Sequence, residues 1–308
     1  MSADREAGIR DGVVVELHAR NCIVESDGET WRCVLRGRFY GKMRRTTRPV
    51  AVGDRVRFKE TGPGEGAVEE LLPRRTKLSR PGIEKGDREQ VIATNVDRVI
   101  VVAAISKPEF RVGLVDRILI ASRAAGLDAV LCVNKCDEGD PAEFEPTIAP
   151  YRETGVPVVF TSAVSGLGID ELRGYMTDVT SVLSGQSGVG KSSLINAVQP
   201  GLRLKVGDIG EKTGKGRHTT TWVSLLRLDF GGYVVDTPGV REFGLWEVDR
   251  AGLDGFFPEI SELASGCRFP DCSHSHEPGC SVKEAVEAEE IRTVRYDSYL
   301  RILESLDD

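Results

Sequence analysis

Hydrophobic positions along the chain follow three different patterns, one after another. Between residues 12 and 72 they form five short runs, and in Thr30–Leu35 apolar residues alternate with polar ones. A period of two predicts a half-buried β-strand. Five short strands in one region predict a small β-barrel, of which the OB-fold is a common form that binds nucleic acids. The expected strands are 12–17, 21–26, 30–35, 52–58 and 66–72.

The pattern changes after residue 72. Residues 73–80 are mostly polar and predict a linker. Beyond them, the stretch 96–105 is dominated by apolar residues, as in a strand that a parallel sheet buries on both faces. Residues 114–125 then show helical periodicity and end at Gly126, a residue type common just after a helix. Two more strands, at 129–133 and 156–160, complete the prediction of an α/β domain.

The last part of the chain is predicted to be mainly helical, with helices at about 249–264 and 282–306. The expected organisation is therefore multidomain. It comprises an OB-fold barrel at 1–72, a linker at 73–80, an α/β domain at 81–244 and a helical domain at 245–308.

A glycine-rich stretch lies between an apolar run and a helical pattern. It reads Gly-Gln-Ser-Gly-Val-Gly-Lys-Ser and matches G-x-x-x-x-G-K-[ST], the phosphate-binding P-loop. Glycines let the backbone N–H groups turn towards phosphate oxygens, and the helix that follows adds its positive end. Lys191 is expected to contact the phosphates and Ser192 to ligate Mg²⁺, so the chain is predicted to bind a nucleoside triphosphate. The residues expected around the phosphates are Gly185, Gln186, Ser187, Gly188, Val189, Gly190, Lys191, Ser192 and Ser193.

Composition narrows the class of protein. Of the 308 residues, 40% are hydrophobic and 29% charged, as in an ordinary soluble globular protein. No run of eighteen apolar residues occurs, and the polar start of the chain lacks the apolar core of a signal peptide, so a cytoplasmic location without membrane contact is expected. In that compartment the seven cysteines are expected to be reduced thiols or metal ligands.

Charge is unevenly distributed. The formal net charge of −7 argues against a uniformly basic nucleic-acid binder, but no acidic residue occurs between Thr30 and Gly53. The loop 36–48, which also carries Phe39 and Tyr40, is therefore expected to contact RNA. The alternative is a solvated face of the barrel. The basic residues of this interval are Arg32, Arg36, Arg38, Lys42, Arg44, Arg45 and Arg48.

Two short motifs follow predicted strands of the α/β domain. The tetrad N-K-x-D at 134–137 resembles the guanine-specificity motif of GTPases, in which the Asp137 carboxylate would accept from the ring N–H and the exocyclic amine of guanine. Adenine does not present that donor pair, so a base with the wrong edge would leave the carboxylate badly matched. The pair Ser162–Ala163 resembles the S-A-x motif, whose backbone contacts the guanine oxygen. The tetrad consists of Asn134, Lys135, Cys136 and Asp137.

Two later stretches resemble the switches of a GTPase. In 216–221, either Thr219 or Thr220 would bind Mg²⁺ when the γ-phosphate is present. In the D-x-x-G motif that begins at Asp236, the carboxylate would hold Mg²⁺ and the N–H of Gly239 would meet the γ-phosphate.

The group that positions the attacking water is less evident. Many GTPases place a glutamine directly after D-x-x-G, but this chain has Val240, which can neither donate nor accept. His218 is the nearest polar substitute and is expected to hold the water. The alternatives are that His218 packs or faces solvent, or that a partner positions the water.

A cysteine cluster follows the switches. Its spacing, Cys-x₄-Cys-x-His-x₅-Cys, offers three thiolates and one imidazole, which can close a tetrahedral shell around one structural Zn²⁺. His276 is close enough in sequence to replace His274 as the nitrogen ligand. The predicted ligands are Cys267, Cys272, His274 and Cys280.

The order of these motifs is unusual, because the guanine motifs precede the P-loop and both switches follow it. This order indicates a circularly permuted GTPase, since permutation keeps a packed core and moves only the chain ends. A barrel, a permuted GTPase core and a Cys₃His cluster together resemble the bacterial family of ribosome small-subunit-dependent GTPases A (RsgA or YjeQ). The resemblance spans roughly residues 12 to 300.

The resemblance implies a GTP hydrolase that binds the 30S subunit and its 16S rRNA, is stimulated by that subunit and acts late in its maturation. A monomer is expected. Three alternatives remain: a permuted GTPase that acts on the large subunit, a protein in which GTP is only a structural ligand, and an enzyme that uses ATP. Hydrolysis measured with each subunit, and competition between GTP and ATP, would separate them.

Overall fold

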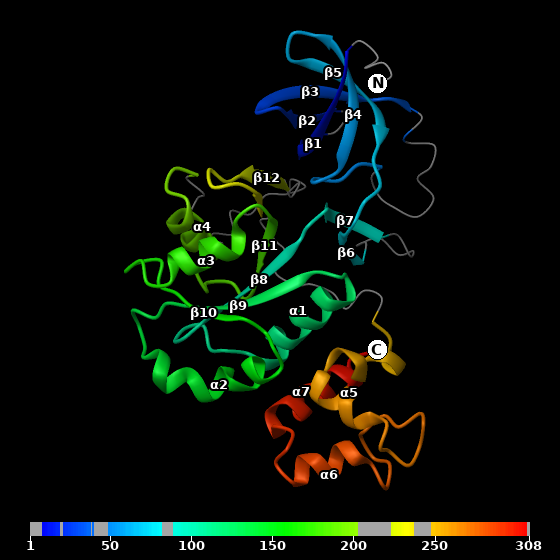
Figure 1. The fold of residues 1–308 in the computed structure, drawn as a ribbon, viewed down its shortest axis with the longest axis vertical. Coiled ribbons are helices and arrows are strands. Elements are labelled where there is room, and N and C mark those ends of the chain that lie inside the picture. The colour runs from blue at the N-terminus through cyan, green and yellow to red at the C-terminus, as the bar shows by residue number, and fades with distance from the viewer. Residues whose placement is uncertain are drawn as a thin grey trace, which may run out of the picture. The chain divides into compact units, whose positions relative to one another are not determined.

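The computed structural model describes residues 8–18, 21–37, 39, 49–81, 89–202, 223–236 and 248–306 (Figure 1). The chain forms two compact units. One comprises residues 1–98, 176–182 and 205–240, and the other comprises residues 99–175, 183–204 and 241–308. None of the helices in the described ranges combines the length and the hydrophobicity that crossing a bilayer requires.

The first unit begins with a closed five-stranded barrel. Strand β1 pairs antiparallel with β2 and β4, β2 pairs with β3, and β3 pairs parallel with β5, which returns to β4. The predicted barrel is therefore confirmed. The strands are β1 (Ile9–Leu17), β2 (Asn21–Ser26), β3 (Glu29–Leu35), β4 (Arg55–Gly62) and β5 (Glu65–Leu71).

Alternating side chains fill the barrel. Strand β2 alternates strictly between buried and half-buried residues, and the rings of Trp31 and Phe58 meet inside with centroids 5.6 Å apart. Gly12 lets β1 approach β2 closely, because a Cβ there would lie 2.4 Å from the Val24 side chain. Burying each large apolar side chain contributes about 1.5–3 kcal/mol. The core consists of Val14, Cys22, Val24, Trp31, Cys33, Val50, Val56, Phe58 and Val68.

The segment after the barrel is attached to it through Asp54. This carboxylate is buried and accepts hydrogen bonds from the Arg74 guanidinium at 2.7 and 2.8 Å and from Thr94 at 2.9 Å. Gly53, at φ +89°, turns the chain just before it, so β4 starts at Arg55 and not at residue 52 as expected. Within the predicted linker, strand β6 (Lys77–Pro81) already begins, and it pairs with β7 (Glu89–Thr94).

Three more strands belong wholly or partly to the first unit. Strand β13 (Tyr233–Asp236) pairs parallel with β11 (Thr180–Ser184) and antiparallel with β12 (Ser224–Arg227). Strand β12 also meets the barrel, because Ser224 pairs with Glu16 of β1.

The second unit contains parallel strands and their connecting helices. Strand β9 (Asp128–Asn134) neighbours β8 (Arg98–Ala104) in the sheet and pairs in parallel with β10 (Val158–Phe160). The buried run of β8 matches the apolar stretch expected at 96–105. The helices are α1 (Val112–Ala124), α2 (Pro141–Glu153), α3 (Ile169–Met176) and α4 (Lys191–Val198).

The C-terminal part of this unit is helical, but its helices are shorter than expected. In the first, Pro258 takes the opening position of α5, and two 3₁₀ turns precede it. In the second, Glu289 adopts a left-handed φ of +61°, which ends α6 and separates it from α7. The elements are η2 (Arg250–Gly252), η3 (Asp254–Phe256), α5 (Pro258–Ala264), α6 (Ser281–Glu287) and α7 (Thr293–Glu304).

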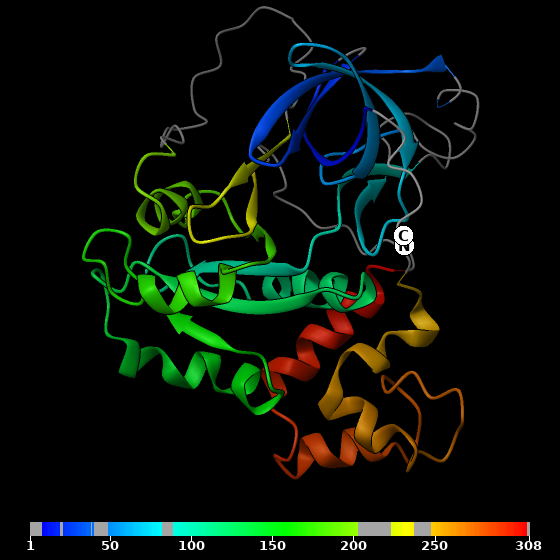
Figure 2. The ribbon, with the colours of Figure 1, turned by 45° about the horizontal axis from the view of Figure 1, so that its top comes forward.

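A buried ion cluster joins the C-terminal helices to α1. Helices α1 and α7 lie side by side (Figure 1, Figure 2), and Arg295 of α7 pairs with Asp116 of α1 and, at 2.7 Å, with Glu259 of α5. The guanidinium lies over the rings of Tyr151 and Phe257. The helical part therefore packs on the α/β part through charge as well as through apolar side chains.

Candidate active site and metal centre

The predicted P-loop runs from the end of β11 to the start of α4, and its glycines meet close contacts or adopt backbone angles that other residues seldom take. Gly185 has φ +144°, and a Cβ there would lie 2.0 Å from the carbonyl oxygen of Val102. Gly190 has φ +95° and caps α4, and a Cβ there would lie 2.4 Å from the Asn134 amide. Gly188 also has a left-handed φ, of +83°. Side chains at these positions would displace the loop, which explains why the motif is so rich in glycine.

The polar residues of this loop lie at its exit into α4. The ammonium of Lys191 donates to the carbonyl oxygens of Gly185 and Gln186 at 2.7 and 2.9 Å, so the side chain folds back over the loop. Ser192 and Ser193 lie in the first turn of α4, where the backbone N–H groups have no acceptor within the helix.

Asn134 connects the N-K-x-D tetrad to the P-loop. It ends β9, is 2% exposed, and donates from Nδ2 to the carbonyl oxygen of Val189 at 2.8 Å. Its Oδ1 accepts from the Thr161 hydroxyl at 3.2 Å. Asn134 thus fixes the distance between two loops that lie 55 residues apart in sequence. Thr161 belongs to none of the predicted motifs, and its only signal in the sequence is its place directly before the Ser-Ala pair.

The other tetrad residues are oriented by their neighbours. Asp137 accepts from the Ser162 hydroxyl at 2.5 Å, and the same hydroxyl accepts from the backbone N–H of Ser165 at 3.0 Å. Lys135, at φ +68°, donates to the carbonyl oxygen of Lys107 at 2.6 Å. These contacts bring the tetrad together with the Ser162–Ala163 turn at one edge of the strands. The thiol of Cys136 turns back to its own strand and donates to the Val133 carbonyl oxygen.

The predicted switches are only partly described. Asp236 ends β13, where its backbone pairs with Ser224 and burial raises the pKa of its carboxyl. Of the other residues expected there, His218, Thr219, Thr220 and Gly239 lie outside the described residues, as does Val240.

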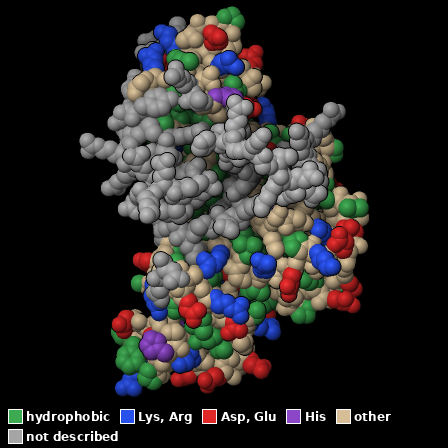
Figure 3. All heavy atoms as spheres, turned by 180° about the vertical axis from the view of Figure 1, so that it is seen from behind, with side chains coloured by type: hydrophobic (Ala, Val, Ile, Leu, Met, Phe, Trp, Pro, Cys, Tyr) green, Lys and Arg blue, Asp and Glu red, His purple; other side chains and the backbone are tan. Residues whose placement is uncertain are grey.

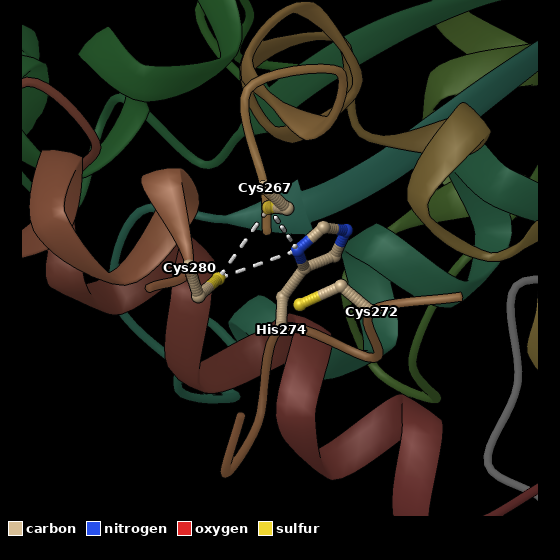
Figure 4. Close-up of side chains that lie close together, drawn as sticks. All are labelled: Cys267, Cys272, His274 and Cys280. Carbon is tan, nitrogen blue, oxygen red and sulfur yellow. Dashed lines mark hydrogen bonds between the residues drawn. The ribbon is translucent and has the colours of Figure 1, made fainter. Parts of the chain in front are cut away.

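The Cys₃His cluster converges on one point (Figure 4). The four ligand atoms lie within 4.8 Å of one another. His274 Nδ1 is 3.5 Å from the sulfur atoms of Cys267 and Cys280, and these two sulfur atoms are 3.8 Å apart. In a tetrahedral Zn²⁺ site with bonds of about 2.0 Å to nitrogen and 2.3 Å to sulfur, the corresponding separations are about 3.5 and 3.8 Å. These three separations fit a zinc site, and the Cys272 sulfur lies within 4.8 Å of the other ligand atoms.

The burial of His274 and the pKa values of the cluster residues agree with this geometry. His274 is 2% exposed and burial lowers the pKa of its imidazole, which favours the neutral ligand form, whereas the His276 side chain is 82% exposed and lies outside the cluster. Burial and the neighbouring Cys280 thiol, opposed by the backbone N–H of His274, raise the pKa of Cys272 to about 12. A bound cation would be needed to ionise the Cys272 thiol at neutral pH.

Residues outside the Cys₃His motif hold the cluster loop in shape. The Glu277 carboxylate accepts from the backbone N–H groups of Ser273 and Ser275 at 2.9 and 3.1 Å. Although burial raises it, hydrogen bonds from Ser273 lower the pKa of Glu277 overall. Two tyrosines of α7, Tyr296 and Tyr299, donate to carbonyl oxygens of the same loop at 2.6 and 3.0 Å.

Basic side chains on the described surface of the barrel pair with acidic ones. Arg57 pairs with Asp11 and Glu70, at 3.3 and 3.0 Å, and Arg36 pairs with Glu69. On the face shown in Figure 3, acidic and basic side chains of the described residues are interspersed. Much of the expected RNA-contacting loop, residues 38 and 40–48, lies outside the described residues.

Comparison with known proteins places these features in one family. A family model described as RsgA GTPase matches residues 71–246, and one described as RsgA N-terminal domain matches residues 11–68. A protein of Moorella thermoacetica, named small ribosomal subunit biogenesis GTPase RsgA, is 42% identical over 293 residues, which cover 95% of this chain and 96% of that protein. A protein of the same name from Thermotoga neapolitana is 39% identical over 301 residues, with 96% and 97% covered.

Two solved structures are similar to this chain over nearly its full length. YjeQ from Thermotoga maritima matches with a TM-score of 0.78 at 36% identity, covering 97% of this chain and 98% of that chain. YloQ, described as a circularly permuted GTPase, matches with a TM-score of 0.75 at 29% identity, covering 100% and 98%. The predicted fold class, with a barrel, a permuted GTPase domain and a helical C-terminal part, is confirmed.

Proposed function

We propose that this chain, which belongs to the RsgA GTPase family and is a GTP hydrolase of small ribosomal subunit biogenesis, binds the small subunit, acts late in its maturation and hydrolyses GTP faster when bound to it. Full-length relatives carry the name small ribosomal subunit biogenesis GTPase, which supports this partner. Such a partner would place the activity in the bacterial cytoplasm.

One observation carries the proposal that the nucleotide is GTP. Asn134 ties the P-loop to the N-K-x-D tetrad, and Ser162 orients the Asp137 carboxylate beside it. A nucleotide whose phosphates lie on the P-loop would therefore present its base to Asp137. Because a carboxylate only accepts, it suits the two donors on the edge of guanine and not the edge of adenine.

The remaining roles follow from position. Lys191 would exchange its loop carbonyls for phosphate oxygens, and Gly239 would donate its N–H to the γ-phosphate. Ser192 and Asp236, with Thr219 or Thr220, would hold Mg²⁺, and both described residues offer the hard oxygen ligands that this ion prefers. When bound, Mg²⁺ would neutralise charge that develops on the phosphates.

We propose that His218 orients the attacking water, since Val240 cannot. Hydrolysis of GTP needs a positioned water more than covalent chemistry from the protein, so this residue decides how fast the bound nucleotide turns over. Contact with the small subunit would hold His218 in position and thereby accelerate hydrolysis.

We also propose that Cys267, Cys272, His274 and Cys280 hold one structural Zn²⁺. The separations of their ligand atoms support this metal, and four protein ligands leave no open position for catalysis. Zinc would hold the loop between α5 and α6 in a shape suited to contact with 16S rRNA. A second RNA contact would come from the loop 36–48 of the barrel.

Cosedimentation tests the proposed partner. The purified protein is centrifuged with 30S or 50S subunits in the presence of GDP or a non-hydrolysable GTP analogue. We expect it to pellet with 30S in the analogue and to stay in the supernatant with 50S. Equal pelleting with both subunits, or with neither, would exclude a small-subunit GTPase.

A further inference from the structure

A short hairpin connects the two switch-like stretches of the chain. Strand β12 begins three residues after Thr221, where the first stretch ends, and β13 ends at Asp236, where the second begins. A displacement of this hairpin would therefore change the position of both stretches. Strand β13 also pairs with β11, which leads directly into the P-loop.

The barrel holds both strands of this hairpin. On β2, one carboxylate oxygen of Glu25 accepts from Arg227 of β12 at 2.7 Å and from the hydroxyl of Tyr233 of β13 at 3.1 Å. The backbone adds a second attachment, because Glu16 of β1 pairs with Ser224. We call Glu25, Arg227 and Tyr233 the hairpin latch.

The latch is more than a loose surface ion pair. The Glu25 side chain is only 13% exposed, and two donors from different strands share the same oxygen. Burial and the Glu25 carboxylate raise the pKa of Tyr233, so the phenol keeps its proton and can donate. Arg227 is 59% exposed and lines an open cleft, so its charge can be changed without disturbing packed side chains.

The far end of the hairpin is held just as closely. Its turn contains Gly231 and Gly232, at φ +90° and +79°. A Cβ at Gly231 would lie 2.0 Å from the Asp178 carboxylate, and one at Gly232 would lie 2.3 Å from the carbonyl oxygen of Val179. The hairpin thus lies between the barrel and the residues that enter β11, with little room to move independently of either.

We propose that Glu25 is a positioning residue that couples the barrel to the two switches. It acts through Arg227 and Tyr233: when the barrel is fixed on RNA, the latch fixes the hairpin and with it the strand ends that carry the switch residues. This inference rests on the proposed stimulation by the small subunit. It goes beyond that proposal by assigning the barrel a part in hydrolysis as well as in binding.

Charge reversal tests the latch. Glu25→Arg places two guanidinium groups together, Arg227→Glu places two carboxylates together, and the double variant restores the ion pair in reverse; Tyr233 can donate or accept in either arrangement. The control is Glu70→Arg, because Glu70 pairs at 3.0 Å with Arg57 on the surface of the barrel, away from the latch residues. For each protein the GTP turnover alone and with saturating 30S, the affinity for 30S, and the melting temperature are measured.

We expect each single reversal to lower the 30S-stimulated turnover about fivefold, the size of effect that a partly buried ion pair supports. Basal turnover, 30S affinity and melting temperature should stay within about twofold or a few degrees of the wild type, and the double variant should recover most of the stimulated rate. The control should behave like the wild type.

Three results would overturn the inference: single reversals that are stimulated like the wild type, a loss that follows reduced 30S affinity or melting temperature, and a double variant that recovers nothing. A wild-type protein that 30S does not stimulate would refute the proposed function as well. That failure is distinguishable, because it appears in the wild type before any variant is compared.

Discussion

Arg295 offers a quantitative test of how the C-terminal helices are attached. Its side chain is 7% exposed and pairs with Asp116, which is fully buried, while its guanidinium lies 4.8 Å from the centroid of the Phe257 ring. Arg295→Met keeps most of the apolar stem and removes the charge. The variant leaves a buried carboxylate without its cation, which typically costs 3–5 kcal/mol.

Urea unfolding followed by helical circular dichroism measures the loss. With a denaturant slope of about 2 kcal/mol per molar, a destabilisation of about 4 kcal/mol lowers the midpoint by about 2 M. The matched control is Arg292→Met, at the N-cap of the same helix. Arg292 pairs with Glu153 at 2.7 Å, but the two side chains are 58% and 50% exposed. Because water screens such a pair, the urea midpoint of this variant should hardly move.

The pH dependence identifies the cause. Burial raises the pKa of Asp116 and Arg295 opposes that shift, so removing Arg295 raises the pKa further. A carboxyl whose folded pKa lies above its unfolded value destabilises the fold at high pH and ceases to do so as it protonates. The gap between wild type and Arg295→Met should therefore shrink between pH 7.5 and pH 5. A gap equal to that of Arg292→Met, or one that is independent of pH, would refute the reasoning.

Four further predictions concern the candidate sites. Asp137→Asn should weaken GTP and improve XTP in competition binding, because an amide replaces one acceptor by a donor; an unchanged preference for GTP would exclude Asp137 as the base-reading group. Purified protein should contain about one zinc per chain, and Cys272→Ala should lose it and lower the melting temperature while nucleotide binding persists; a metal-free wild type of equal stability would exclude the zinc site. His218→Ala should keep GTP affinity and lose at least about tenfold in 30S-stimulated turnover, whereas near-normal turnover would place the water-positioning group elsewhere. Neutralising Arg44 and Arg45 should weaken 30S binding and reduce its salt slope by about one unit per lost phosphate contact; an unchanged slope would mean that this loop is only a solvated face.

Features that depend on local spacing could be predicted from the sequence. The alternating runs indicated the barrel, because side chains of a strand point to opposite faces in turn. The P-loop and the Cys₃His cluster each lie within fourteen residues. Their residues are therefore close together in space, whatever the tertiary fold around them. Even the choice between His274 and His276 needed the structure, since both offer an imidazole at a plausible spacing.

Long-range pairs could not be predicted in this way. Arg295 meets Asp116 across 179 residues and Arg227 meets Glu25 across 202, and no periodicity marks either pair. The break between α6 and α7 was also missed, because Glu289 is a residue type that seldom adopts a left-handed φ. Here backbone hydrogen bonds to Ala285 from Glu290 and Ile291 turn the chain in place of a glycine.

GTP turnover measured alone, with 30S and with 50S subunits tests the central claim most directly. The P-loop and the N-K-x-D tetrad are complete, so the protein alone should bind GTP. It should hydrolyse GTP slowly, because Val240 cannot position the attacking water. Saturating 30S should raise turnover at least about tenfold, which lowers the barrier by about 1.4 kcal/mol, and 50S should leave the rate near its basal value. Equal rates in all three conditions, or stimulation by 50S alone, would contradict a GTPase that acts on the small subunit.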